Sequence, residues 1–154
     1  MKVTLVGHAS VIIETADLHI WTDPWTDGKA FNDSWTLIAP AELPAAALDE
    51  IDYLWISHEH PDHFHVPTLR ALPDSFKQRV TVLFQENNSD KMLAALRRLG
   101  FPKSMTLPHR KRVALSCLTS AYCYQVGQMD SALGVQAEGE CVFDVNDAEL
   151  NTRD

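Results

Sequence analysis

Residues 57–63 concentrate side chains that bind metals, because three imidazoles and two carboxylates occur together directly after the apolar stretch 53–56. Imidazole nitrogens and carboxylate oxygens are the usual protein ligands of zinc and of catalytic iron or manganese. Burying so many polar groups costs free energy unless a cation compensates for their desolvation. The segment therefore predicts a metal site at the end of a strand.

The spacing within this segment predicts two ions. His58 and His60 are two residues apart, so an extended backbone directs both imidazoles to one side, where they can bind one cation. Asp62 and His63 follow Pro61, whose fixed φ helps to turn the chain, and these two can bind a second cation nearby. The grouping fits a two-metal site with ions about 3.5 to 4 Å apart and a bridging water or hydroxide. A polar loop of uncoordinated histidines is the alternative, and so dense a cluster argues against it.

Length and composition describe an ordinary folded protein and exclude some functions. The 154 residues, 45% of them hydrophobic, predict one domain over residues 1–154. The formal net charge of -8 argues against nucleic acid as a partner, since phosphate recognition draws on clustered Lys and Arg. No apolar run approaches the roughly eighteen residues that a membrane span needs.

The cysteines and the N-terminus concern the compartment. Cys117, Cys123 and Cys141 form no C-x-x-C pair, and an odd number of cysteines does not suit a disulfide framework. The N-terminal residues contain no long apolar segment of the kind that directs secretion. We therefore expect a reducing, cytoplasmic location.

The elements that must position the ligands are those of an α/β domain. Strands are expected at residues 2–6, 11–15, 18–22, 53–56, 80–84, 113–124, 132–136 and 140–144. Brief turns make the first three an antiparallel meander. Helices are expected at residues 66–72 and 89–99. Polar clusters then lie where strands end, the usual place for a site in such folds.

The long connection at residues 23–40 is unusually aromatic. It contains Trp25, Phe31 and Trp35, and loops of this length are typically functional or disordered. The aromatic side chains favour an ordered loop, which either forms the wall of a pocket or covers the core.

The pattern His58-x-His60-x-Asp62-His63 after a hydrophobic strand resembles the signature of the metallo-β-lactamase superfamily. The branch that it resembles contains the L-ascorbate-6-phosphate lactonases, the N-acyl-phosphatidylethanolamine phospholipases D and the metallo-β-lactamase-like portion of CMP-N-acetylneuraminate hydroxylases. The similar segments are Gly7-His8-Ala9-Ser10, Thr22-Asp23-Pro24-Trp25, Gly28-Lys29-Ala30-Phe31, Ile56-Ser57-His58, Pro67-Thr68-Leu69 and Met129-Asp130-Ser131.

This resemblance implies a fold and a ligand set. The implied fold is an αβ/βα sandwich with the metals at one edge between two similar halves. We expect this chain to form only the first half, a mixed and largely antiparallel sheet with helices on one face. The resemblance implies that His58 and His60 bind the first metal and that Asp62 and His63 bind the second. Asp147 would bridge both metals, and its alternative role is to cap the turn after a strand.

Two histidine ligands of the superfamily pattern are missing from the chain. The third ligand of the first metal is expected a few residues before Asp130-Ser131, where residues 124–129 contain no histidine. The last ligand, a histidine of the second half, would lie beyond Asp154. If Asp147 bridges, each metal keeps three protein ligands, which is an open, catalytic number.

Further residues are candidates for completing or supporting the site. The resemblance places His8 toward the site, where it and Asp62 are the candidate catalytic residues; the alternative for His8 is a structural polar residue. Asp23 is a candidate acceptor that holds a ligand imidazole, and His65 is a candidate extension of the site. Cys123 could serve as a soft ligand, although a buried structural cysteine is the stronger interpretation.

These assignments predict a metal-dependent hydrolase that cleaves an ester, lactone or phosphoester of a small-molecule substrate with a metal-bound water. Zinc is the expected metal, as one or two ions, with iron or manganese as alternatives. The alternative function is that of a half-length homologue or fragment that has lost catalysis and acts as a binding or assembly module. A half sandwich should leave an apolar sheet face uncovered, so we expect a homo-oligomer or a partner chain to cover it.

Overall fold

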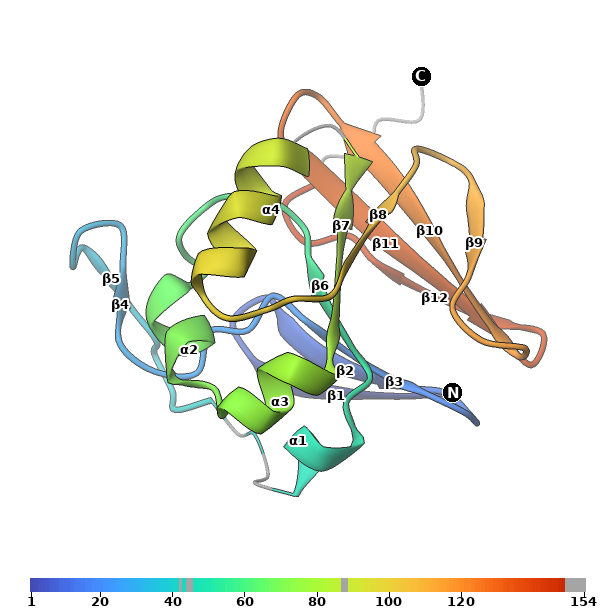
Figure 1. Ribbon diagram of the computed structural model, residues 1–154, viewed down its shortest axis with the longest axis horizontal. Coiled ribbons are helices and arrows are strands. Elements are labelled where there is room, and N and C mark those ends of the chain that lie inside the picture. Colours follow the sequence, from blue (N-terminus) through green and yellow to red (C-terminus); the bar gives the residue numbers. More distant parts are fainter. Residues whose placement is uncertain (42, 44–45, 87–88, 149–154) are drawn as a thin grey trace.

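The structure, a computed structural model, describes residues 1–41, 43, 46–86 and 89–148. Two sheets dominate it (Figure 1). The larger contains, in spatial order, β1 (Lys2–Gly7), β2 (Ser10–Glu14), β3 (His19–Thr22), β6 (Tyr53–Ile56), β7 (Thr81–Gln85) and β8 (Ser104–Leu107). The smaller contains β12 (Glu140–Asp144), β11 (Asp130–Ala137), β10 (Thr119–Val126) and β9 (Arg112–Ala114). A short ribbon joins β4 (Lys29–Ala30) and β5 (Trp35–Thr36).

The helices lie on one side of the larger sheet and the smaller sheet lies on the other (Figure 1). In the described residues they are α1 (Ala47–Glu50), α2 (Val66–Ala71), α3 (Asp74–Arg79) and α4 (Ser89–Arg98). None of these described helices combines the length and the apolar character that crossing a lipid bilayer requires.

Strand direction in the larger sheet follows the length of the connections. β1, β2 and β3 pair antiparallel across short turns, as the sequence predicts. β3, β6, β7 and β8 pair parallel, because longer connections that include the helices carry the chain back between them. The carboxyl ends of β3, β6 and β7 therefore meet at one edge of the sheet.

Alternation along the strands gives the larger sheet two apolar faces. One face packs against the helices through a cluster that includes Trp21, Leu54, Val82, Leu69, Phe76 and Leu96. The other packs against the smaller sheet through a cluster that includes Ile20, Trp55, Leu83, Ala121, Leu133 and Val135. Burying each of the larger apolar side chains contributes about 1.5 to 3 kcal/mol. These two clusters hold the edge that carries the polar residues.

Most of the expected elements are confirmed, with ends shifted by a residue or two. The single strand expected at residues 113–124 is wrong. It is two strands, β9 and β10, because the Leu115 and Ser116 amides both donate to the Thr119 carbonyl and turn the chain between them. α3 and β8 were not expected: they are as short as α2 and β6, but their sequences DSFKQR and SMTL lack the continuous apolar run that marks β6.

An apolar face remains on the outer side of the smaller sheet. Phe143 of β12 is 39% exposed there, and its ring lies 4.9 Å from that of Tyr124 on β10. Phe143 also lies over Gly134 of β11, where an added Cβ would come within 3.3 Å of its ring. Residues next to these along each strand, such as Leu133, point the opposite way into the core.

Candidate metal centre

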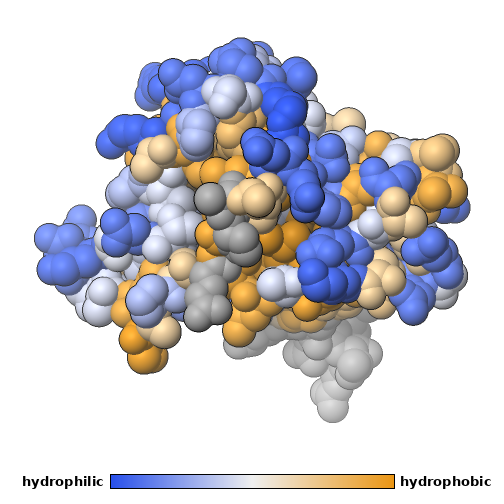
Figure 2. Space-filling model, turned by 90° about the horizontal axis from the view of Figure 1, so that it is seen from below, coloured by the Kyte–Doolittle hydropathy of each residue, from blue (hydrophilic) through white to orange (hydrophobic). Residues whose placement is uncertain are grey.

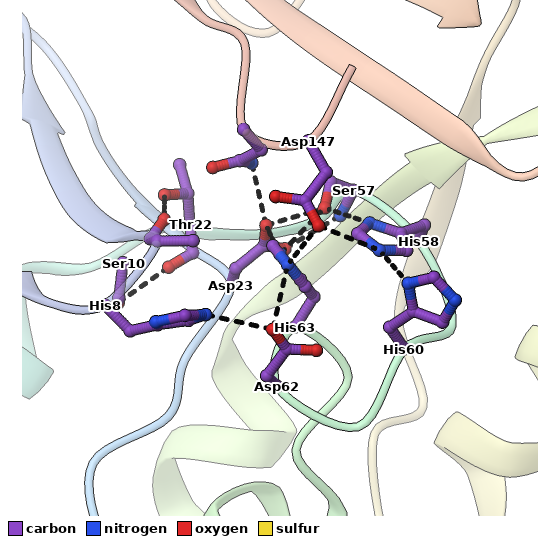
Figure 3. A network of polar contacts seen from close by, with 12 residues as sticks. His8, Ser10, Thr22, Asp23, Ser57, His58, His60, Asp62, His63 and Asp147 are labelled. Atoms are coloured by element: carbon purple, nitrogen blue, oxygen red, sulfur yellow. Dashed lines mark hydrogen bonds and ion pairs between the residues drawn. The ribbon is translucent and has the colours of Figure 1, made fainter. Parts of the chain in front are cut away.

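Loops at one edge of the larger sheet bring the polar residues together (Figure 3). Asp23 follows β3 and His58 comes shortly after β6, and because these strands are parallel neighbours their ends lie side by side. His8 lies in the turn between β1 and β2, and Asp147 lies in the turn after β12. Residues far apart in the sequence thus surround the segment 57–63.

Asp23 holds this segment in place. It is 1% exposed, and its carboxylate accepts hydrogen bonds from the Ser57 amide (2.8 Å) and hydroxyl (2.6 Å), His63 Nδ1 (2.8 Å) and Asn146 Nδ2 (2.7 Å). The expectation that Asp23 accepts from an imidazole of the cluster is confirmed. Asp23 has a φ of 38°, a left-handed backbone conformation that costs free energy in a residue with a Cβ. The four hydrogen bonds hold it in this conformation.

The same bonds determine which ring nitrogens face the cluster. His63 donates through Nδ1 to Asp23, so in the neutral ring the lone pair is on Nε2. Ser57 donates its hydroxyl hydrogen to Asp23, so the Ser57 oxygen accepts from His58 Nδ1 at 2.9 Å. His58 Nε2 then also carries a lone pair. Neutral imidazoles with this tautomer are the form in which histidine binds a metal.

Electrostatics differ between the two imidazoles. Burial lowers the pKa of His58, and the neighbouring His63 lowers it further, which favours neutral His58. Burial also lowers the pKa of His63, but the hydrogen bond and charge of Asp23, with the charges of Asp62 and Asp147, raise it above its ordinary value overall. These carboxylates therefore favour positive charge at the position of the His63 ring.

The predicted ligands converge, with Asp147 between the two pairs. His58 Nε2 lies 2.7 Å from His60 Nδ1, and His63 Nε2 lies 3.4 Å from Asp62 Oδ2. Asp147 Oδ2 lies 4.0 Å from His58 Nε2 and 3.4 Å from His63 Nε2. A carboxylate in this intermediate position is within reach of both pairs.

Two buried polar atoms of the cluster lack a hydrogen-bond partner among the described residues. They are Asp62 Oδ1 and His63 Nε2, in residues that are 4% and 0% exposed. Leaving such atoms unpaired costs about 1 to 3 kcal/mol each. A cation would satisfy both, so the donor set fits a metal.

In the described residues, three groups bring their ligand atoms within 4.8 Å of one another: His8, Asp62 and His63; His58, His63 and Asp147; and His58, His60 and Asp130.

Asp130 belongs to the cluster, although the sequence singled it out only as part of a similar segment. It is the first residue of β11, and its Oδ1 lies 3.8 Å from His58 Nε2. The only signal in the sequence is its place directly after residues 124–129, where the superfamily histidine is missing.

His8 connects the cluster to a cavity. Its Nε2 donates to Asp62 Oδ2 at 2.9 Å, and its ring lies edge-on to Trp25 and Trp35, with centroids 5.2 and 6.4 Å away.

The adjoining cavity has a volume of about 700 Å³, within the range of small-molecule sites. Its lining is largely apolar and includes Leu5, Val6, Trp25, Trp35, Leu37 and Ile38. Apolar side chains also gather on the face of the molecule shown in Figure 2. The aromatic loop therefore forms the wall of a pocket.

His65 and Cys123 have structural roles. His65 Nδ1 accepts from the Thr68 amide at 3.2 Å and caps α2, while its Nε2 donates to the Lys29 carbonyl at 3.2 Å. Both ring nitrogens are occupied, so the expectation that His65 extends the site is wrong. Cys123 is buried between the sheets, where burial raises the pKa of its thiol to about 12. This is the structural role favoured for Cys123.

Comparison with known proteins identifies the family. Residues 2–151 match the family model described as a β-lactamase superfamily domain. The chain belongs to the metallo-β-lactamase superfamily. Relatives of this superfamily chain include a Mycobacterium tuberculosis protein described as a Rieske 2Fe-2S iron-sulfur protein, 34% identical over 160 residues, with 96% of this chain and 30% of that protein covered. The cytidine monophosphate-N-acetylneuraminic acid hydroxylase of Asterias rubens is 41% identical over 75 residues, with 47% of this chain and 11% of that protein covered.

Solved structures confirm the metallo-β-lactamase fold. A possible metal-dependent hydrolase from Veillonella parvula has a TM-score of 0.72 at 16% identity, with 97% of this chain and 64% of that chain covered. CmlA, a diiron β-hydroxylase from Streptomyces venezuelae, has a TM-score of 0.67 at 21% identity, with 95% of this chain and 29% of that chain covered. The chain thus spans 30% or less of the two curated relatives and less than two thirds of either structure.

Proposed function

We propose that this chain is a metal-dependent hydrolase of an ester, lactone or phosphoester. The observation that carries the proposal is the pair of buried atoms Asp62 Oδ1 and His63 Nε2 in the cluster of Figure 3, which have no hydrogen-bond partner among the described residues. The residues proposed to hold the metal are His58, His60, Asp62, His63 and Asp147. Zinc, or alternatively iron or manganese, bound as one or two ions, would supply a water of lowered pKa and stabilise charge on the oxygen under attack.

The protein's own side chains orient this site. The hydrogen bond from His63 Nδ1 to Asp23 prevents the imidazole from rotating and keeps Nε2 directed at the cluster. His8 holds Asp62 in the same way from the cavity side. Because the His8 side chain is 32% exposed next to the cavity, we assign it a second role: as an imidazolium it would keep its Nε2–H on Asp62 and donate its Nδ1–H to the carbonyl or phosphoryl oxygen of the substrate.

The cavity supports a small-molecule substrate with an apolar group. Its walls are mainly apolar, and His8 lies where the cavity meets the cluster. An apolar group bound between Trp25 and Ile38 would leave the bond to be cleaved beside His8 and Asp62. Burial of that group would supply binding energy and hold the reacting bond in place.

Hydroxylation is a second candidate function, because two of the similar proteins are hydroxylases. A hydroxylase from Asterias rubens is a sequence relative, and a diiron β-hydroxylase from Streptomyces venezuelae shares the fold. Imidazole and carboxylate ligands also suit iron. Hydrolysis consumes only water, whereas hydroxylation consumes dioxygen and reducing equivalents, so the two functions are separable by experiment.

The first test is metal content. After incubation with zinc, iron(II) or manganese(II) and desalting, we expect elemental analysis to find one or two equivalents bound to the parent chain. The double variant His58→Ala, His60→Ala should lose at least one of them. His19→Ala, which removes a histidine of β3 outside the cluster, should bind as the parent does. A parent chain that binds none of these metals would falsify the proposal.

The second test is activity of the metal-loaded chain against nitrophenyl esters, lactones and phosphodiesters. Hydrolysis that is lost in Asp62→Asn supports the proposal. Dioxygen consumption by the iron-loaded chain with a reductant, in the absence of hydrolysis, would instead support hydroxylation. Metal binding without either activity would favour the alternative of a binding or assembly module.

A further inference from the structure

The metal proposed for His58 and His60 has an unfilled place in its ligand set. The superfamily pattern puts a third histidine in residues 124–129, and this chain has none there. The structure brings a carboxylate to the same two imidazoles, because His58, His60 and Asp130 place their ligand atoms within 4.8 Å of one another. We propose that Asp130 is the third protein ligand of this metal and replaces the missing histidine.

The distances fit a shared ion. Two atoms that each bind one ion at about 2.1 Å lie at most about 4.2 Å apart. Asp130 Oδ1 and His58 Nε2 are separated by 3.8 Å, inside this limit. The His58 side chain is 1% exposed and that of Asp130 is 35% exposed, so the imidazole lies inside and the carboxylate lies at the mouth of the site. The open side of the ion would then face solvent and substrate.

Both neighbours of Asp130 are tied to the edge of the larger sheet. Ser131 donates its hydroxyl hydrogen to the carbonyl of Ser57, the residue that precedes His58. Gln85, at the end of β7, donates its side-chain amide hydrogen to the Met129 carbonyl. Ser131 and Gln85 are 1% and 3% exposed. The start of β11 is therefore held against the ends of β6 and β7, and the backbone of Asp130 cannot move away from His58 without breaking these hydrogen bonds.

A carboxylate in place of an imidazole changes which metals the site prefers. Two histidines and one carboxylate with open positions are the ligand set of non-haem iron(II) sites, and oxygen ligands also suit manganese(II). A third histidine would favour zinc. We therefore expect Asp130 to lower the preference for zinc over manganese(II), relative to a chain with histidine at this position.

The test uses the full chain and does not depend on activity. Zinc and manganese(II) are titrated separately by calorimetry, and bound manganese is also followed by electron paramagnetic resonance. Asp130→Asn should weaken one equivalent of metal about tenfold or more, a loss at least as large as loss of a supporting residue causes. Asp130→His should restore the zinc equivalent and raise the ratio of zinc to manganese affinity above that of the parent.

Glu138→Gln is the matched control, since it removes an exposed carboxylate at the other end of β11 and should bind as the parent does. Thermal unfolding of the metal-free variants checks that folding is unchanged. Parent stoichiometry and affinity in Asp130→Asn would overturn the assignment. The inference rests on the proposed metal centre but not on hydrolysis: weakened binding in Asp130→Asn supports it even if the parent hydrolyses nothing, and unchanged binding overturns it even if hydrolysis persists.

Discussion

Asp23 shapes the centre without being one of the proposed ligands. Its carboxylate accepts from Ser57, His63 and Asn146, which connects the end of β3 to the ligand segment and to the turn that carries Asp147. Through Ser57 it also determines the tautomer of His58. The direction of both imidazoles therefore depends on one buried carboxylate behind them.

Replacement of this carboxylate tests that dependence. Asp23→Asn leaves buried donors without an ionised acceptor, so we expect the free energy of unfolding to fall by about 2 to 4 kcal/mol. Metal affinity should fall by about 10 to 100-fold because His63 is no longer held. Urea denaturation and metal titration measure the two effects. Asp27→Asn, on the exposed part of the same loop, is the control, and superimposable denaturation curves for Asp23→Asn and the parent would contradict the prediction.

Asp144 predicts a pH dependence of stability. Burial, with the charge of Asp23, raises the pKa of Asp144 from 3.8 to about 6. Between these values the folded state holds a proton that the unfolded state has lost, so the stability from Asp144 is full below pH 3.8 and declines as pH rises through about 6. Asp144→Asn should remove a decline of up to about 3 kcal/mol. Chemical denaturation of the metal-free chain from pH 4 to 8 checks this, and parallel curves for variant and parent would refute it.

At the scale of elements, strand direction decides which side chains meet. β3, β6 and β7 are parallel, so their carboxyl ends deliver polar residues to one edge. β11 and β12 are antiparallel, so the start of one and the end of the other lie at the same end of the hairpin. That end carries Asp130 and leads to Asp147, and the bond from Ser131 to Ser57 joins it to the edge of the larger sheet.

The aromatic loop provides a prediction at the same scale. Trp35 is 51% exposed and lines the cavity, so its truncation should not disturb the core. If the cavity binds an apolar substrate group as proposed, Trp35→Ala would remove contacts that contribute about 1 to 2 kcal/mol. We expect kcat/KM to fall about tenfold for esters with a long acyl chain and to change little for acetyl esters. Leu118→Ala, at an exposed apolar position away from the cavity, should match the parent; equal losses for both ester classes would contradict the prediction.

At the scale of the whole molecule, the outer face of the smaller sheet carries exposed aromatic side chains apart from the cavity. Tyr124 and Phe143 lie there, with the exposed fraction of Phe143 at 39%. The solved structure from Veillonella parvula that shares the fold is longer than this chain, which covers 64% of it. Aromatic side chains of this kind lose contact with water when another layer of structure packs on them, so the outer sheet face is a candidate contact surface.

We propose that a second copy of the chain covers this face. Light scattering should then find a mass near twice 17.3 kDa. Phe143→Lys places a charge in the contact and should shift the protein toward the monomer, whereas Leu118→Lys, on the turn between β9 and β10, should not. A parent that is monomeric at all concentrations measured would exclude self-association.

Local pattern was sufficient for much of the fold and for the first part of the site. The ligands in residues 57–63 are contiguous, so their chemistry is visible without knowing any contact. Strands such as β6 and helices such as α4 were also predictable, because burial on one or two faces imposes a period on the sequence. The missing histidine in residues 124–129 is equally a property of sequence alone.

Tertiary structure decided what completes the centre. The contacts of Asp130 with His58, of Asn146 with Asp23 and of His8 with Asp62 join residues on different elements, and no period in the chain encodes them. They exist because parallel strands align their ends and buried hydrogen bonds hold the neighbouring turns against that edge. The sequence by itself therefore determined that ligands for a metal are present, and only the packing of the two sheets decided which carboxylates and which cavity face them.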